Sequence, residues 1–383
     1  MDSLAAAPVM SGLPIFEASI TALDAYRGFR RAPIRFMVTT SSLVDLARSF
    51  ADLRYPGLPY ADAVLETPEE DAEAGPVCTY FRCVDSPSVA EAALFAPLDL
   101  MRDPRRNVFL DPRGVYPLLR EASAAMRPGP PEDQLFQAAV LLARQPYELG
   151  TESLSETPRD LAVAWQRDLL GLVMTGPSPW RALELLLRSG FVGAYWPELA
   201  GLSGLDQSKE HHPEGDAWAH TMETFRYRKT PSLRLSLALL LHDVGKPDSS
   251  AVEGRRFDRH AEIGSSIAAR FLTRLGFPPQ LVSDVRFLVR YHMMPAALPR
   301  IPLNRLEGII DDPRFPLLLE LYKCDELSTF RGPDGYYEAC AAYRSWSRNS
   351  RNPWRSPDGK KLARAWLEET PRSPAPSRRG AAR

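Results

Sequence analysis

The sequence has few cysteines and no long apolar run. Its 383 residues include four cysteines, none of them in a Cys-x-x-Cys pair. A chain of this length needs no disulfide framework, so reduced thiols fit best. No run of 18 apolar residues occurs, and the first residues lack the basic start and apolar stretch of a secretion signal. These absences predict a soluble, cytoplasmic protein without a membrane partner.

The chain as a whole also lacks an excess of positive or negative charge. The net charge is only −1, so no global field marks the chain as a binder of nucleic acid or membranes. Residues 341–383 nevertheless hold eleven Lys or Arg against three Asp or Glu. The terminal PRSPAPSRRGAAR has nothing to bury, which predicts a basic, partly disordered tail over residues 333–383. Such a tail can add salt-sensitive affinity for RNA, or it is simply a solvated end.

The first third of the chain mixes strand-like and helical patterns. Residues 35–40, 77–84 and 107–110 have the β-branched and aromatic content of strands, whereas residues 42–53 have helical spacing. This mixture predicts a small α+β domain over residues 1–125.

Three amphipathic segments follow, at residues 133–144, 159–174 and 178–196, and proline or glycine separates them. They predict a helical neck over residues 126–210. Amphipathic spacing alone carries no chemistry, so we interpret these helices as scaffold.

Histidine is scarce and confined to one region. All six histidines lie between His211 and His292. An apolar run, Leu235 to Leu241, precedes the pair His242 and Asp243. This run predicts a buried helix that delivers the pair at its last turn, before a glycine and a proline stop it.

Further candidate ligands lie on comparable helical segments. These ligands are His220, His260, His292 and Asp325. A single histidine beside an apolar helix is usually a core or capping residue, but this clustering favours a joint site. Imidazole and carboxylate donors suit manganese, iron, magnesium, cobalt, nickel or zinc. A shared aspartate would bridge two such ions at about 3.5 to 4 Å.

The order His, His-Asp, His, His, Asp resembles the HD superfamily of metal-dependent phosphohydrolases. Residues 177–207 followed by HHPEGDAWAHT resemble the neck and the start of the HD domain in bacterial CCA-adding tRNA nucleotidyltransferases and related poly(A) polymerases. The similarity extends over residues 35–330 and is weaker in the first domain. It implies a mainly α protein, with an all-helical HD domain at residues 211–332 behind the neck and an α+β nucleotidyltransferase-like head.

The head departs from the pattern of that family. The family has an Asp-x-Asp pair before Thr-Thr-Ser and a Gly-Gly motif upstream, but here Arg35, Phe36 and Met37 precede Val38, and no Gly-Gly pair occurs. Phosphoryl transfer to a hydroxyl needs the metal ions that those carboxylates bind. We therefore predict a degenerate head without nucleotidyltransferase activity.

Arginines of the head and neck bear on nucleotide and RNA binding. Of the family's nucleotide-binding arginines on the neck helix only Arg144 is retained, because Gln137 and Val140 occupy the other positions. Several other arginines either contact RNA phosphates or are solvated surface residues. They are Arg27, Arg30, Arg31, Arg105, Arg106 and Arg113.

Chemistry and resemblance together assign roles in the HD segment. His220, His242, Asp243 and Asp325 would bind a first ion, and Asp243 would bridge to a second ion held by His260 and His292. A metal-activated hydroxide would then attack phosphorus.

Lys246 either steadies the phosphate or leaving oxygen, as a catalytic residue beside Asp243, or it satisfies the carbonyls at the helix end. His211 and His212 resemble a His-Pro element at the mouth of the site, which makes them structural or substrate-lining.

Two hypotheses of different classes follow. The first is a phosphohydrolase acting on phosphomonoesters or phosphodiesters of nucleotides or RNA ends, with tRNA or another RNA as a partner. The alternative is an RNA-binding or RNA-processing protein, built on a degenerate transferase, that lacks hydrolytic activity. The complete HD ligand set favours the hydrolase.

Overall fold

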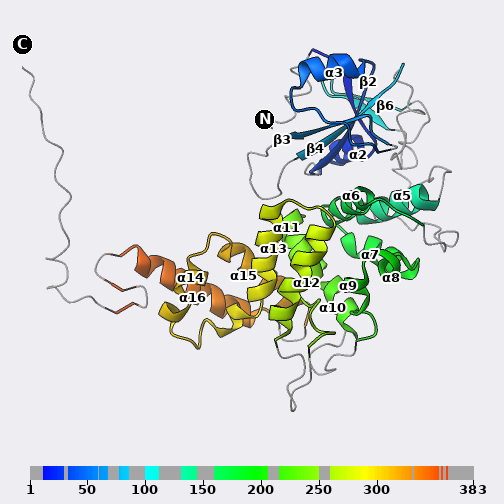
Figure 1. The fold of residues 1–383 in the computed structure, drawn as a ribbon. Helices are drawn as coiled ribbons and strands as arrows, with labels where there is room; N and C mark the ends of the chain where they lie inside the picture. Colours follow the sequence, from blue (N-terminus) through cyan, green and yellow to red (C-terminus); the bar gives the residue numbers. More distant parts are fainter. Residues whose placement is uncertain are drawn as a thin grey trace, which may run out of the picture.

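The computed structural model shows a sheet followed by two groups of helices (Figure 1). The described residues are 12–29, 33–58, 60–67, 77–85, 100–111, 131–144, 159–205, 215–249, 259–329, 332–352, 355–356 and 359–360. Within them, no helix has the length and apolar character needed to cross a membrane.

The head is a six-stranded mixed sheet in the order β3-β4-β2-β1-β5-β6. Strands β2 and β4 are parallel, and the other neighbours are antiparallel. The strands are β1 (Ile15–Ala18), β2 (Ile34–Thr39), β3 (Ala63–Thr67), β4 (Val77–Cys83), β5 (Met101–Asp103) and β6 (Val108–Leu110). The three predicted strands are confirmed as β2, β4 and β6, and the α+β character of the head is therefore correct.

Two helices accompany this sheet, α2 (Ser19–Arg27) and α3 (Leu43–Ser49). Ser42 caps α3 by accepting a hydrogen bond from the backbone of Asp45. The helix ends before the predicted residue 53 because Phe50 is extended and stacks on Phe81 of β4, with ring centroids 5.7 Å apart.

The neck consists of α5 (Pro131–Arg144), α6 (Val163–Met174), α7 (Pro179–Arg188), α8 (Phe191–Tyr195) and α9 (Pro197–Ala200). Helix α6 begins four residues later than predicted. The third predicted helix is two helices, because the left-handed Gly190 (φ 77°) separates α7 from α8. Trp165 packs edge-on against Phe136 of α5, and Trp196 packs edge-on against Phe191.

The remaining helices form the last part of the fold (Figure 1). They are α10 (Ala217–Thr224), η2 (Phe225–Tyr227), α11 (Leu233–Leu241), α12 (His260–Arg274), α13 (Pro279–Tyr291), η3 (Met294–Ala297), η4 (Leu303–Leu306), α14 (Glu307–Ile310), α15 (Phe315–Leu327) and α16 (Asp334–Ser350). Their core is continuous with that of the neck.

Helix α16 lies in the segment predicted as a tail. It packs on the preceding helices, because the buried Trp346 donates to Asp311 Oδ1 at 2.7 Å and the ring of Tyr343 lies against that of Phe315 in a tilted arrangement. The basic terminal residues 361–383 lie outside the described residues. The boundaries predicted for the four domains stay predictions.

Candidate metal centre

The candidate ligands sit at helix ends and on helix faces that the local sequence fixes. Asp216 caps α10 by accepting from Ala219 N at 2.8 Å, and His220 follows on the buried side of that helix. Helix α11 is apolar and buried, and it ends with His242 as its C-cap residue. Helix α13 likewise ends at His292. Two of the imidazoles are therefore anchored where a helix stops, and both are buried.

Gly245 controls how close α12 comes to Asp243. A Cβ atom at Gly245 would lie 2.2 Å from the carbonyl oxygen of His260 and 2.4 Å from the nitrogen of Gly264. Only glycine allows the two backbones to meet at this distance. The first residue of α12, His260, is thereby brought beside the turn that carries Asp243.

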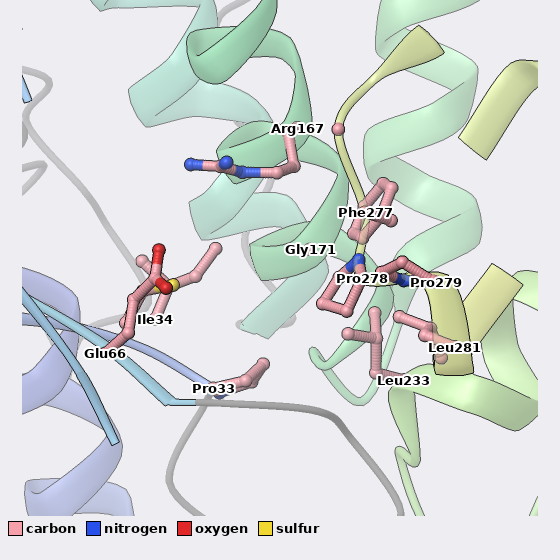
Figure 2. A pocket seen from close by; sticks show the side chains of 12 residues that line it. Pro33, Ile34, Glu66, Arg167, Gly171, Leu233, Phe277, Pro278, Pro279 and Leu281 are labelled. Atoms are coloured by element: carbon pink, nitrogen blue, oxygen red, sulfur yellow. The ribbon is translucent and has the colours of Figure 1, made fainter. Parts of the chain in front are cut away.

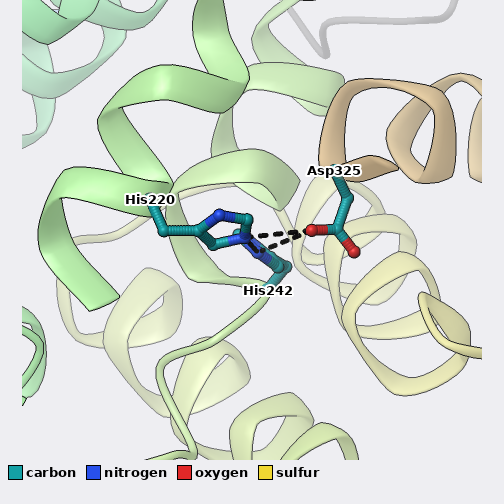
Figure 3. A group of neighbouring side chains, drawn as sticks. All are labelled: His220, His242 and Asp325. Carbon is teal, nitrogen blue, oxygen red and sulfur yellow. Dashed lines mark hydrogen bonds and ion pairs between the residues drawn. The ribbon is translucent and has the colours of Figure 1, made fainter. Parts of the chain in front are cut away.

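Figure 3 shows a first group of ligands, formed by His220, His242 and Asp325. The Nε2 atom of His220 lies 3.0 Å from Asp325 Oδ1 and 3.4 Å from Nε2 of His242. His242 Nε2 is 3.8 Å from the same carboxylate oxygen. The three side chains come from α10, α11 and α15, and they converge on one point.

A second group is formed by Asp243, His260 and His292. The Nε2 atoms of the two histidines are 3.2 Å apart, and Asp243 Oδ1 lies 3.5 Å from His260 and 4.0 Å from His292. The other oxygen of Asp243, Oδ2, faces the first group at 3.3 Å from His242 Nε2. Asp243 therefore presents one oxygen to each group.

Hydrogen bonds at Nδ1 fix which nitrogen of each ring carries the proton. Nδ1 of His242 donates to the carbonyl of Leu239 at 2.7 Å, and Nδ1 of His292 donates to that of Val289 at 2.8 Å. In a neutral ring the Nε2 atom then carries no proton, so its lone pair can bind a metal ion.

The same reasoning applies to His220 through Ser328. The hydroxyl of Ser328 gives its proton to the carbonyl of Asp325 at 2.6 Å, so towards His220 Nδ1, at 3.3 Å, it can only accept. Nδ1 of His220 therefore donates to Ser328, while Nε2 hydrogen-bonds to Asp325 Oδ1 at 3.0 Å and gives up that proton when it binds a metal ion. Sequence reasoning missed Ser328, which follows Asp325 by three residues, one helical turn along the same helix face.

The lone pairs on Nε2 of His242 and His292 face the oxygens of Asp243, at 3.3 and 4.0 Å, and such lone pairs repel unless a cation or a proton lies between them. Asp243 Oδ2 is buried and accepts no hydrogen bond of suitable geometry from the described residues, although Lys246 Nζ lies 2.5 Å away as an ion pair. Nitrogen and oxygen donors in this arrangement match the ligands that divalent transition metals take. The residues present thus fit the metal ions that an HD domain implies.

The protonation states agree with this fit. Burial would raise the pKa of Asp243 and of Asp325, but the imidazoles around them, and Lys246 beside Asp243, hold both below the usual carboxyl range. Burial, together with His242 and His260, lowers the pKa of His292 to about 4. At neutral pH the carboxylates are ionised and His292 is neutral, which are the states that bind metal.

Lys246 forms an ion pair with Asp243. Its ammonium is largely buried and contacts Asp243 Oδ2, the oxygen that faces the first group, so it occupies a place where a cation would sit. Contact with a phosphate stays a prediction. His211 and His212 lie outside the described residues.

The centre of the head sheet is filled by aromatic side chains. Phe36 of β2 stacks on Tyr80 at 5.8 Å between centroids, and Tyr60 packs edge-on against Tyr80 at 5.7 Å. A cavity of only about 10 Å³ is left between them and the end of β1. Glu17 of β1 is opposite Met37 but is paired with Arg102 at 2.7 Å.

The arginines of the head and neck have specific contacts. Arg144, retained from the nucleotide-binding pattern, is buried and donates to both oxygens of Asp24. Arg105 donates to the carbonyl of Leu13, and Arg27 lies over the ring of Tyr26. Arg106 is 3.8 Å from Asp103 and largely exposed. Arg30, Arg31 and Arg113 lie outside the described residues.

Comparison with known proteins supports the HD assignment. Residues 218–312 match the HD domain family. The chain is 38% identical over 177 residues to a CC-adding tRNA nucleotidyltransferase of Thermus thermophilus, which covers 43% of this chain and 39% of that protein. It is 39% identical over 132 residues to a multifunctional CCA protein of Halorhodospira halophila, which covers 34% of this chain and 31% of that protein.

A more distant relative is a bifunctional uridylyltransferase/uridylyl-removing enzyme of Mycobacterium tuberculosis, 27% identical over 235 residues, covering 56% of this chain and 26% of that enzyme. Among solved structures, the apo form of a tRNA-processing enzyme matches this chain with a TM-score of 0.44 and 12% sequence identity. The match covers 92% of this chain and 90% of the chain of that enzyme. The matched segments span 39% and 31% of the length of the first two relatives. The chain thus contains an HD domain and is homologous, over part of its length, to CCA-adding tRNA nucleotidyltransferases.

Proposed function

We propose that this protein is a metal-dependent phosphohydrolase acting on phosphomonoesters or phosphodiesters of nucleotides or RNA ends. The observation that carries the proposal is the convergence of two ligand groups on the two oxygens of Asp243. When bound, two divalent ions at such a site supply Lewis acidity and lower the pKa of water towards neutrality.

The protein's own residues hold and orient these groups. His220, His242 and Asp325 would hold one ion with Oδ2 of Asp243, while His260 and His292 would hold the other with Oδ1. The backbone carbonyls that accept from Nδ1 prevent the rings of His242 and His292 from rotating away.

A cation in the first group would compete with Lys246 for Oδ2 of Asp243. We infer that the ammonium is then displaced towards the incoming phosphate, whose oxygens it can contact as a point charge. Lys246 would in this way bind substrate only when the metal is present. The catalytic residues of the proposal are therefore Asp243 and Lys246.

The substrate class rests on the relatives. Their names refer to tRNA nucleotidyl transfer and to uridylyl transfer and removal. This supports a role in RNA processing with a nucleotide or RNA end as substrate and tRNA or another RNA as partner.

Nucleotide addition is the second candidate, because the names of the tRNA-specific relatives favour it. Against it stands the composition of β2, which carries Arg35, Phe36 and Met37 and offers no carboxylate to a magnesium ion. The cavity beside Phe36 and Met37, next to the aromatic rings of Tyr60 and Tyr80, has a volume of only about 10 Å³, far too small for a triphosphate. We therefore propose that transfer is absent.

Hydrolysis is tested with protein loaded with manganese, cobalt or nickel. The panel comprises a generic phosphodiester, 2′,3′-cyclic nucleotides, nucleoside monophosphates, dinucleoside polyphosphates and short RNAs with different 3′ ends. His242→Ala and His260→Ala should each abolish turnover, since each removes a ligand from a different group, whereas Arg35→Ala in the head should change it little. No hydrolysis by metal-loaded protein would favour the RNA-binding alternative without hydrolytic activity.

Nucleotide addition is tested by extension of a labelled RNA with each nucleoside triphosphate and magnesium. We expect no extension. Robust extension that a substitution in the head abolishes would show that the head is an active transferase.

A further inference from the structure

A second cavity lies away from the metal centre, between the head, the neck and the HD helices (Figure 2). Its volume is about 320 Å³. The head contributes a row of cross-strand neighbours on β2, β4 and β3, the neck contributes one face of α6, and the HD part contributes the start of α11 and the connection from α12 to α13. The lining residues that matter here are Ile34, Glu66, Cys78, Arg167, Gly171 and Leu281.

Glycine at position 171 leaves room for this cavity. A Cβ atom at Gly171 would lie 3.0 Å from Cδ1 of Ile34, so a larger side chain would project into the space between α6 and the sheet. Most of the wall is apolar, with Pro278 and Leu281 on the HD side. Apolar walls with a few polar groups at a junction of domains are the usual features of a small-molecule site.

The polar groups of the cavity retain unused hydrogen-bonding capacity. Arg167 donates to Asp168 and to Tyr80 through Nε and Nη2, but Nη1 has no acceptor among the described residues. Glu66 accepts a hydrogen bond from Arg54 at Oε2, whereas its Oε1 atom accepts none from the residues that the structure describes. Figure 2 shows Arg167 reaching from α6 towards the strand that carries Glu66. The cavity thus offers one donor group and one acceptor.

Both charges are already compensated. Asp168 Oδ1 lies 3.0 Å from Arg167, and Arg54 lies 3.3 Å from Glu66. An anionic or cationic ligand would lose its hydration without finding an unpaired counter-charge. The chemistry therefore favours a neutral ligand with polar edges.

We propose that this cavity binds a small, flat, neutral heterocycle that accepts a hydrogen bond from Arg167 and donates one to Glu66. A volume of about 320 Å³ corresponds to about ten waters of liquid, so the ligand has about ten non-hydrogen atoms, the size of a bicyclic lactam. A ligand of this size has an expected Kd of about 0.1 to 1 mM. The site is independent of the proposed hydrolase.

Three bicyclic probes of similar size test the chemistry by ligand-observed NMR on the full chain. Quinolin-2-one has both the acceptor and the donor, N-methylquinolin-2-one lacks the donor, and quinoline-2-carboxylate is an anion. We expect the lactam to bind, the N-methyl compound to bind at least about fivefold more weakly, and the anion to bind least. Tightest binding by the carboxylate would overturn the neutral-ligand assignment.

Two cysteines on β4 give a second measurement with an internal control. Cys78 lines the cavity, and Cys83 does not. Both thiols are partly exposed, and burial raises the pKa of each to about 11, so their intrinsic reactivity is similar. At ten times its Kd, quinolin-2-one should slow alkylation of Cys78 by N-ethylmaleimide about elevenfold and leave Cys83 unchanged.

A side chain that fills the cavity should abolish both the binding of quinolin-2-one and the protection of Cys78. Gly171→Leu places a side chain in the space, whereas Gly193→Leu adds the same group to an exposed helical position with nothing within 4 Å and serves as the control. Binding and protection should be lost in the first variant and kept in the second. Binding that survives Gly171→Leu, or the absence of saturable protection of Cys78 with every probe, would overturn the proposal.

Discussion

Substitution of Gly245 by alanine should separate the two ligand groups. The added Cβ atom would lie 2.2 Å from the carbonyl oxygen of His260, whereas ordinary van der Waals contact begins at about 3.4 Å. Both atoms of this contact belong to backbone or to Cβ, so no side chain can rotate away. The start of α12 must therefore retreat by about 1.2 Å, the difference between these two distances.

The retreat acts on one group and spares the other. His260 is the first residue of α12, and its Nε2 lies 3.5 Å from Asp243 Oδ1, so this distance would grow towards about 4.7 Å. His220, His242 and Asp325 come from other helices. We expect metal content to fall from about two ions to about one per chain, and hydrolysis to fall about 100-fold for a displacement of about 1 Å. Overpacking should reduce the free energy of unfolding by about 1–3 kcal/mol.

Elemental analysis and urea unfolding measure these quantities. Gly193→Ala is the matched control, because its Cβ atom meets nothing within 4 Å and alanine favours a helix over glycine. It should keep both ions and gain a few tenths of a kcal/mol. If Gly245→Ala binds two ions and turns over like the parent protein, the close backbone contact does not position His260 and the reasoning is wrong.

Three further predictions concern metal, stability and pH. Asp243→Ala should remove most of the metal and His220→Ala less, because the aspartate faces both groups; metal content unchanged by Asp243→Ala would refute the site. Asp168→Ala should reduce the free energy of unfolding, measured in urea titrations, by about 3–5 kcal/mol, because Arg167 and the hydroxyl of Tyr60 lose their buried acceptor. A loss below about 1 kcal/mol would contradict this expectation. Burial lowers the pKa of His292 to about 4, below its unfolded value, so the unfolded chain binds the extra proton. Metal-free protein should then lose up to about 3 kcal/mol of stability between about pH 6.5 and pH 4, and a flat profile there would argue against a buried, neutral ring.

The elements that carry the site could be predicted because their signals are local. The run Leu235 to Leu241 is helical and buried, and His242 and Asp243 follow it as expected. The sequence likewise predicts helical segments at His260 and His292, and α12 and α13 confirm them. Apolar periodicity and glycine or proline stops act over a few residues, so they survive in any tertiary context.

The distances between the groups could not be predicted in this way. They depend on α12 meeting the turn at Gly245 and on α15 bringing Asp325 to His220, which is 105 residues away in the chain. The short strands β1, β3 and β5 were missed for a related reason. Three to five residues carry too little alternation to be recognised, and they are strands because neighbouring strands pair with them.

Arg144 has structural contacts at a position that resembles a nucleotide-binding one. Its position on α5 resembles that of a nucleotide-binding arginine, but its guanidinium is buried between Asp24 of α2 and the carbonyl of Leu172 on α6. The two contacts with Asp24 tie the head to the neck, and the third joins α5 to α6 within the neck. Removing one partner of such a buried pair costs about 3–5 kcal/mol. An arginine held in this way cannot turn to a triphosphate without leaving Asp24 unpaired. A head with Arg35, Phe36 and Met37 in place of the paired carboxylates would therefore still require this arginine for its attachment to the neck.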